Sequence, residues 1–117
     1  MINIKKLKTI NGPIQIKHQK NIVINGNNCL GAFNLEHFHI LLKKGMNNNI
    51  TKQTIMHELI HSIESPHEMG LKETNIDILA TAILYIIKNN PEFVKFLQGN
   101  DHGKTKTNRK NNRSKRH

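Results

Sequence analysis

Short apolar runs separated by turn signals fill the first half of the chain, a pattern typical of β-strands. Residues 14–17 place isoleucine at every second position, and residues 22–24 form a β-branched run. An Asn-Gly pair, which is a strong turn signal, precedes the first run, and another follows the second. Residues 37–42 also alternate, with Phe, Ile and Leu at every second position. We expect short strands in this half, the last of them half-buried.

Helical spacing replaces this alternation after residue 50. Between Thr51 and Ile63 the apolar residues recur at intervals of three and four, which predicts one amphipathic helix. Asn49 or Thr51 is the expected N-cap, and the residue before Pro66 is the expected end of the helix. The predicted apolar stripe consists of Ile55, Met56, Leu59, Ile60 and Ile63.

Two further helices are predicted before residue 99. The second extends from Lys72 to Lys88, and Pro91 suits the first turn of a short third helix that ends at Gly99. The expected inward-facing residues are Ile76, Ala80, Ile83, Leu84 and Ile87 on the second helix and Phe93, Val94, Phe96 and Leu97 on the third. Tyr85 is also expected in the core. The most apolar stretch, 76–87, has 12 residues, whereas a membrane span needs about 20, so we expect no membrane anchor.

These elements predict an α+β fold, in which a short antiparallel or mixed sheet is followed by helices. The length of 117 residues suits one domain, which we place at residues 1–99. The single cysteine, Cys29, excludes an internal disulfide framework and a zinc cluster built of cysteines alone. The first residues show no apolar stretch typical of a secretory signal, so we expect a cytoplasmic protein.

The positive charge is concentrated after the predicted domain. The chain has 18 Lys and Arg against 8 Asp and Glu, a formal net charge of +10. Residues 101–117 hold seven of the basic residues and one acidic residue, and they contain no aliphatic residue and no Phe, Tyr or Trp. Residues 100–117 are therefore predicted to be a disordered basic tail. Such a tail either keeps the protein soluble or contacts nucleic acid through residues 104–116.

The pentad His57-Glu58-Leu59-Ile60-His61 carries the most chemical information in the sequence. Histidines four residues apart lie on the same face of a helix, where both can bind one zinc ion. Glu58 lies beside them and can reach a metal-bound water as general base. The alternative is a solvated helix face that carries two histidines. The pentad therefore indicates a zinc hydrolase site with His57 and His61 as ligands.

A third ligand is required, and two residues compete for the role. His67 follows His61 by six residues, a spacing known from metzincins, but Glu64 stands where those proteins need glycine for a sharp turn. Glu73 begins the second predicted helix at the mouth of its apolar stripe, where a carboxylate needs a partner. Asp77, one turn later, is placed to accept a hydrogen bond from a ligating histidine. The pattern favours Glu73 over His67.

The pentad at residues 57–61, followed by Glu73-Thr74-Asn75-Ile76-Asp77-Ile78-Leu79-Ala80, resembles the small zincin-like metallopeptidases of phages and mobile elements. The resemblance covers roughly residues 22–97, and the pentad is its only highly specific element. It implies a zincin-like fold, one zinc ion, peptide-bond hydrolysis, and a location in the cytoplasm of the host cell if a phage encodes the protein. It also implies that the strand Phe38–Leu42, before the active helix, pairs with the substrate backbone.

Two functions are consistent with these patterns. The first is a zinc metallopeptidase that acts on a protein or peptide, with Glu58 as general base and His57, His61 and Glu73 as metal ligands. The second is a nucleic-acid-binding protein with a structural or vestigial zinc site, which the basic tail suggests. Metal content distinguishes a real site from a solvated helix face, and salt-dependent binding tests the second function.

Overall fold

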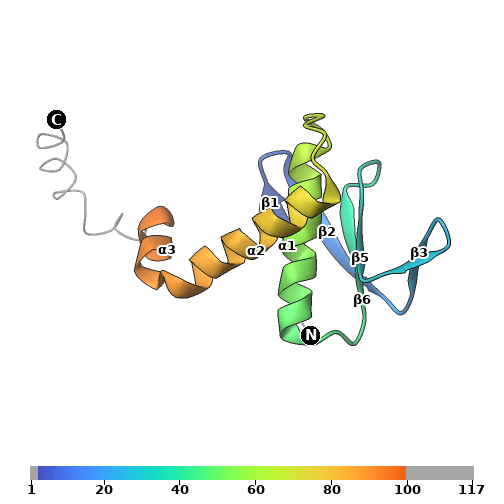
Figure 1. The fold of residues 1–117 in the computed structure, drawn as a ribbon, viewed down its shortest axis with the longest axis horizontal. Helices are drawn as coiled ribbons and strands as arrows, with labels where there is room; N and C mark the ends of the chain where they lie inside the picture. The colour runs from blue at the N-terminus through green and yellow to red at the C-terminus, as the bar shows by residue number, and fades with distance from the viewer. Residues whose placement is uncertain (1–2, 100–117) are drawn as a thin grey trace, which may run out of the picture. The chain divides into compact units, whose positions relative to one another are not determined.

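The computed structural model describes residues 3–99, so the predicted tail and its nucleic-acid contact through residues 104–116 lie outside the described residues. The α+β class is confirmed, because strands precede helices along the chain (Figure 1). The contacts divide the described chain into two units after Leu84. The domain boundary near residue 99 stays a prediction. The elements are β1 (Lys6–Thr9), β2 (Gly12–Gln19), β3 (Ile22–Ile24), β4 (Asn27–Cys29), β5 (Gly31–Asn34), β6 (His39–Lys43), α1 (Asn48–Glu64), α2 (Glu73–Asn89) and α3 (Pro91–Leu97).

The main sheet of the first unit has four strands in the order β1-β2-β6-β5, and β3 and β4 form a separate hairpin. Strands β2 and β6 are parallel, while the other two pairs are antiparallel, so the sheet is mixed. The predicted alternation is confirmed, since Ile14, Ile16, Ile40 and Leu42 are buried on one face. Phe38 adopts a φ of 51° and ends the β5–β6 turn, so β6 begins at His39, one residue after the expected start of the strand at Phe38.

Helix α1 begins three residues before the predicted position. Its N-cap is Asn47, whose side-chain oxygen accepts a hydrogen bond from the N–H of Ile50 at 2.9 Å, so the prediction of Asn49 or Thr51 is wrong. Thr51 is instead buried one turn inside the helix, where its hydroxyl donates to the carbonyl of Asn47 at 2.8 Å. A threonine hydroxyl that donates to a carbonyl of the preceding helical turn can be buried at little cost, because it needs no other polar partner.

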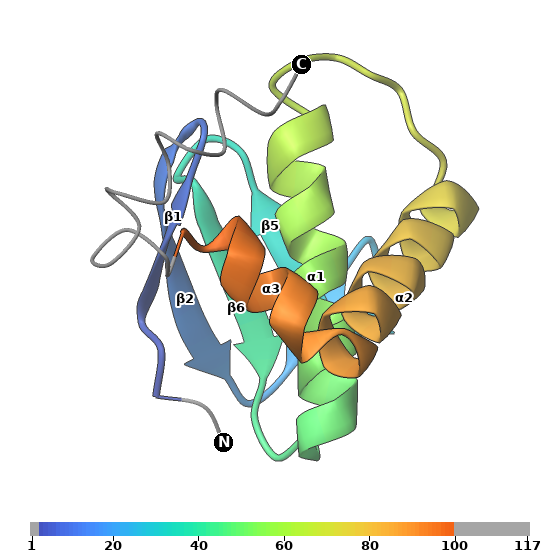
Figure 2. The ribbon, with the colours of Figure 1, turned by 90° about the vertical axis from the view of Figure 1, so that its left-hand side faces the viewer.

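The apolar residues of α1 face two neighbours instead of one. Ile55 and Leu59 pack on the sheet cluster, whereas Met56 and Ile60 join a second cluster with Ile76 and Ala80 of α2. Ile63 is 39% exposed, so the prediction that it belongs to a single buried stripe is wrong. Helix α1 therefore lies between the sheet and the first turns of α2, as the ribbon of Figure 2 shows. The two histidines of the pentad, His57 and His61, face the first turn of α2, where both contact Glu73.

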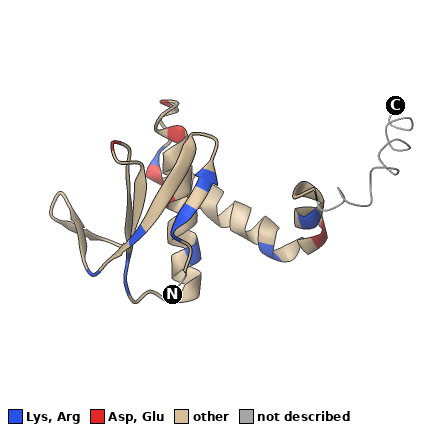
Figure 3. Cartoon of the chain, turned by 180° about the vertical axis from the view of Figure 1, so that it is seen from behind, with Lys and Arg blue, Asp and Glu red and all other residues tan. Residues whose placement is uncertain are grey.

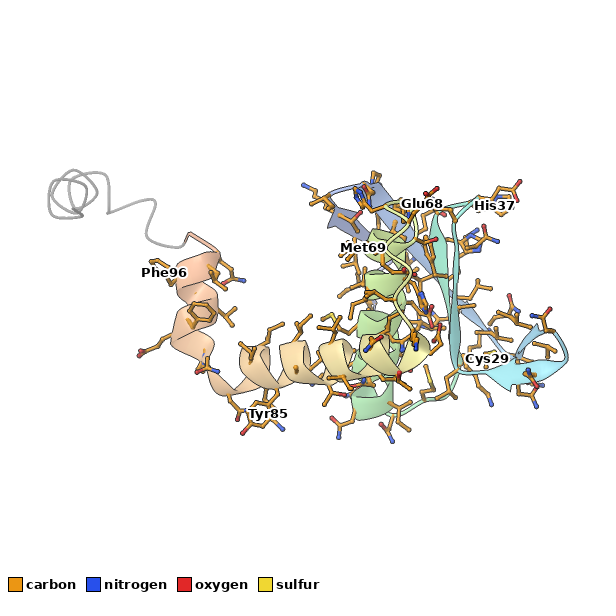
Figure 4. The ribbon with its side chains drawn as sticks, turned by 45° about the horizontal axis from the view of Figure 1, so that its top comes forward. Cys29, His37, Glu68, Met69, Tyr85 and Phe96 are labelled. Carbon is orange, nitrogen blue, oxygen red and sulfur yellow. The ribbon has the colours of Figure 1, made fainter. Side chains whose placement is uncertain are left out.

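The second unit corrects the prediction for the third helix. Tyr85, Phe93, Phe96 and Leu97 are between 48% and 72% exposed, and no residue of α3 is buried. Tyr85 and Phe96 project from their helices in Figure 4. Among the described residues of this unit, the end of α2 and the seven residues of α3 are the helical segments available for packing, and two such short segments cannot enclose each other's side chains. No helix of the described residues is long and apolar enough to cross a membrane.

Gly31 lets β5 approach α1 closely, which leads to a stability prediction. A Cβ atom at this position would lie 2.5 Å from Cγ2 of Thr54 and 3.2 Å from the carbonyl oxygen of Leu41. We expect Gly31→Ala to lower the free energy of unfolding by about 1–3 kcal/mol, because the core must shift to accept the methyl group. In a Thr54→Ser background, which lacks Cγ2, the loss should be smaller. Urea denaturation of the wild type, the two single variants and the double variant measures these losses. Equal losses in the wild-type and Thr54→Ser backgrounds would contradict a close approach of Gly31 to Cγ2 of Thr54.

Candidate metal centre

Helix α1 brings the two histidines of the pentad to one site. Their ring centroids lie 4.9 Å apart, as expected for side chains one turn apart on a helix. Nε2 of His57 lies 2.9 Å from Oε1 of Glu73, and Nε2 of His61 lies 3.0 Å from Oε2 of the same carboxylate. One ligand atom from each of the three residues lies within 4.8 Å of the other two. The predicted set of His57, His61 and Glu73 is therefore together in space.

The loop between α1 and α2 returns the chain to this point. Glu68 and Gly70 have positive φ values of 53° and 68°, which reverse the chain direction after α1. Glu73 is the first residue of α2, and the packing of Ile76 against Ile60 fixes that end of the helix. His67 is exposed in the turn and does not belong to the described metal-binding group. The geometry thus favours Glu73 over His67.

Each histidine also has a carboxylate at its other ring nitrogen. Nδ1 of His57 lies 2.7 Å from Oδ1 of Asp77, and Nδ1 of His61 lies 3.3 Å from Oε2 of Glu64. A carboxylate can only accept, so Nδ1 donates in both pairs and Nε2 is directed to the shared site. Such contacts orient the rings and raise the basicity of metal ligands. The contact of Asp77 agrees with the sequence-based interpretation, whereas Glu64 was considered only as a departure from the metzincin glycine.

Glu64 also connects helix α1 to the loop between α1 and α2. Its Oε1 atom accepts a hydrogen bond from the N–H of Leu71 at 3.2 Å, and the residue is only 9% exposed. One carboxylate therefore orients His61 and holds the chain two residues before Glu73. The spacing of three residues after His61 was the signal in the sequence, because such pairs share a helix face.

The donor set suits a tetrahedral divalent metal. Two imidazole nitrogens and one carboxylate oxygen are the protein ligands of one common class of zinc site, which leaves a fourth position open. Bonds of about 2.0–2.1 Å in tetrahedral geometry place ligand atoms about 3.3 Å apart. The observed separations, all within 4.8 Å, therefore need only side-chain adjustments to reach this geometry. The group could hold a metal ion.

Glu58 lies beside the group and is only 8% exposed. Burial raises the pKa of its carboxyl, and the nearby His57 and His61 partly oppose this effect. A cleft opens beside it, lined by Leu30, Gln53, Thr54, His57, Glu58 and Asp77. Glu58 and the candidate metal ligand His57 thus line the same cleft.

The charges around His57 favour its protonated form. Burial lowers the pKa of His57, but the hydrogen bond with Asp77, the charge of Glu58 and the hydrogen bond with Glu73 together raise it above its ordinary value. A ligating imidazole must be neutral, so protons compete with a metal ion at this residue. Metal affinity at the group should therefore fall as the pH is lowered.

The other histidines of the sheet half form no described metal group. His37 lies in the β5–β6 turn and not on the strand, and its ring stacks on that of His39 with the centroids 5.6 Å apart. Figure 4 shows His37 at the end of the sheet and Met69 in the loop after α1. Within the part of the chain that the structure describes, the group of His57, His61 and Glu73 is the one found.

Comparisons of the chain with protein-family models, with curated proteins and with solved structures gave no match. The resemblance to zincin-like metallopeptidases therefore rests on the residues alone. The chain presents a candidate His-His-Glu metal group on a helix that follows a sheet.

Glu64→Ala is expected to weaken both metal binding and the fold. Loss of the carboxylate leaves the N–H of Leu71 without its partner, which costs about 1–3 kcal/mol of unfolding free energy. Loss of the contact with His61 should weaken zinc binding by about 10- to 100-fold. Zinc competition against a chromophoric chelator and urea denaturation measure the two effects. Glu36→Ala, which removes an exposed carboxylate from the β5–β6 turn, is the control. Unchanged zinc affinity in Glu64→Ala would exclude the positioning role.

Proposed function

We propose that this chain is a zinc metallopeptidase in which His57, His61 and Glu73 bind the metal and Glu58 is the general base. The observation that carries the proposal is the convergence of the three ligand atoms within 4.8 Å, with a buried carboxylate on the same helix. An ordinary helix surface would not bury Glu58 or give both histidines a second carboxylate partner.

The roles of the residues follow from their positions. His57, His61 and Glu73 would hold the zinc ion, which would supply Lewis-acid chemistry to the hydrolysis when bound. Glu58 accepts a proton from the attacking water and delivers it to the leaving amine. Asp77 and Glu64 keep the ligating histidines in the orientation and tautomer that binding requires. The cleft beside Glu58 provides room for the substrate.

The strand that would pair with a substrate is β5. The strand Phe38–Leu42 was expected in this role, but β6 has β2 on one side and β5 on the other, so that expectation is wrong. The N–H of Lys43 donates to the carbonyl of Leu30 at 2.9 Å, and hydrogen-bonded pairs alternate in an antiparallel ladder. The main-chain groups of Gly31 and Phe33 therefore point to the free edge. A peptide that adds to this edge would lie next to Glu58, whose Cγ is 3.5 Å from a Cβ built at Gly31.

Metal content and hydrolysis of a general protein substrate test the proposal together. Purified protein should contain about one equivalent of zinc, measured by plasma mass spectrometry, and should release labelled peptides from fluorescein-casein. A chelator should abolish the release, and added zinc should restore it. Protein that holds far less than one equivalent after incubation with zinc would refute the site. Zinc-loaded protein without hydrolysis of casein or of a mixed peptide library would refute the peptidase.

A further inference from the structure

The main sheet has a second face that α1 does not cover. Residues that alternate with the buried isoleucines of β2 lie on this outer face, and Gln15 and Lys17 are both exposed. The strand register continues the face across the sheet. One row contains Lys6, Gln15, His39 and Asn34, and the next contains Lys17, Leu41 and Ala32. Lys8 and Lys43 belong to the same face by alternation. We refer to these residues as the outer sheet face.

The outer sheet face is cationic and carries no carboxylate. Its strands contribute Lys6, Lys8, Lys17 and Lys43, and β1, β2, β5 and β6 contain neither Asp nor Glu. Residues 3–44 hold seven lysines and one acidic residue, a formal charge of +6, whereas residues 45–99 hold four lysines and six acidic residues. In Figure 3 the strands carry blue segments, and the red segments lie on helices and loops. Charge within the described residues is therefore separated, with the negative side at the metal-binding group.

Two aromatic rings lie at one end of this face. The imidazoles of His37 and His39 are stacked, with an interplanar angle of 14° and centroids 5.6 Å apart. Burial lowers the pKa of His39, and the charges of Lys17 and His37 lower it further, which favours a neutral ring. His37 is exposed, so the outer side of the stack is free to receive another flat ring. At the β1 edge of the sheet, across the row that joins His39 to Lys6, a hollow is lined by Lys6, Lys8, Thr9, Gly12 and Pro13.

We propose that the outer sheet face binds single-stranded nucleic acid, with phosphates on its lysines and a base stacked on His37. Open sheet faces that combine cations with flat rings suit single strands, because phosphates and unpaired bases can be contacted together. A duplex hides the faces of its bases and is read by elements that enter a groove, which a flat sheet does not provide. A lipid surface would be met by exposed apolar side chains, and this face has no large exposed one.

This inference is independent of the proposed peptidase. The carboxylates of Glu58, Glu64, Glu73 and Asp77 repel phosphates from the helical side, so the two sites use different surfaces of the first unit. The basic residues of 104–116 would add to the attraction without defining where the strand lies.

Fluorescence anisotropy with a labelled 20-nucleotide single strand of mixed sequence tests the proposal on the full chain. The triple variant Lys6→Gln, Lys8→Gln and Lys17→Gln should bind about tenfold more weakly at moderate salt. Its slope of log affinity against log salt should be shallower by about 2, since each phosphate contact contributes about 0.7 for single strands. The matched control is Lys52→Gln, Lys88→Gln and Lys95→Gln, which removes the same charge from exposed positions on the helices. Equal weakening by the two triple variants would overturn the proposal.

A second variant separates nucleic acid from any polyanion. His37→Ala should weaken binding of the single strand by about fivefold through lost stacking, without changing the salt slope. Inorganic polyphosphate, which has charge but no bases, should bind with the same affinity to wild type and to His37→Ala. Circular dichroism melting confirms that each variant is folded. The proposal fails if polyphosphate or anionic vesicles displace the labelled strand as well as unlabelled single strand does. It also fails if a duplex of the same sequence binds more tightly than the single strand, or if the protein binds no single strand.

Discussion

Glu58→Gln is expected to abolish peptide hydrolysis and to leave zinc binding intact. The amide has nearly the shape of the carboxylate but cannot accept a proton from water at neutral pH. Loss of a general base lowers the rate by about 10²- to 10⁴-fold. His57, His61 and Glu73, which provide the ligand atoms, remain unchanged, so the protein should still hold about one equivalent of zinc.

The variant should also be at least as stable as the wild type before zinc is added. Burial raises the pKa of Glu58, which means that the fold disfavours the charged carboxylate at this position. A neutral glutamine removes that cost, so the midpoint of thermal unfolding should stay the same or rise. A large fall would mean that the charge of Glu58 stabilises the fold, and reduced activity could then not be assigned to the missing base.

Casein hydrolysis, zinc content and thermal unfolding are measured on the same preparations. Glu68→Gln is the matched control, because it makes the same chemical change on an exposed residue of the α1–α2 loop. It should hydrolyse casein at the wild-type rate. Wild-type activity in Glu58→Gln would exclude Glu58 as the base, and loss of activity in both variants would point to a general effect of charge.

The sequence predicts the histidine pair well because the signal is local. Four residues separate His57 from His61, and helical geometry alone places both rings on one face. The apolar residues of α1 are less informative. Ile55 and Ile60 have similar hydrophobicity and spacing, yet one packs on the sheet and the other on α2. A pattern of periodicity records that a residue is buried, but not which neighbour buries it.

The order of the strands depends on contacts between distant parts of the chain. The parallel pairing of β2 with β6 sets Gln15 opposite His39, and no turn sequence encodes this register. The local pattern therefore identified residues 37–42 as a strand, but it could not show that β6 lies between β2 and β5, which rules out the substrate-pairing role that the family resemblance implied for it. The role of Glu64 was missed for a related reason. Its second partner, the N–H of Leu71, is brought back by the loop, and only the folded loop reveals it.

Glu73→Ala is expected to remove most of the bound zinc, and His67→Ala to remove none. The carboxylate of Glu73 lies within 3.0 Å of Nε2 of both histidines, so its loss leaves a site with two protein ligands. Two imidazoles rarely hold zinc against a chelator, and we expect affinity to fall by more than about 100-fold, beyond the effect of removing an orienting contact. His67 is exposed in the turn after α1 and touches no described member of the group.

The zinc content after dialysis and the zinc affinity from chelator competition show directly whether Glu73 or His67 is the third ligand. Asp77→Asn is an informative intermediate, because it weakens only the carboxylate partner at Nδ1 of His57 and should cost about 10- to 100-fold. The order of zinc affinity should be wild type and His67→Ala first, then Asp77→Asn, then Glu73→Ala. Loss of zinc from His67→Ala with retention in Glu73→Ala would show that the turn rearranges around the metal and that the third ligand is His67.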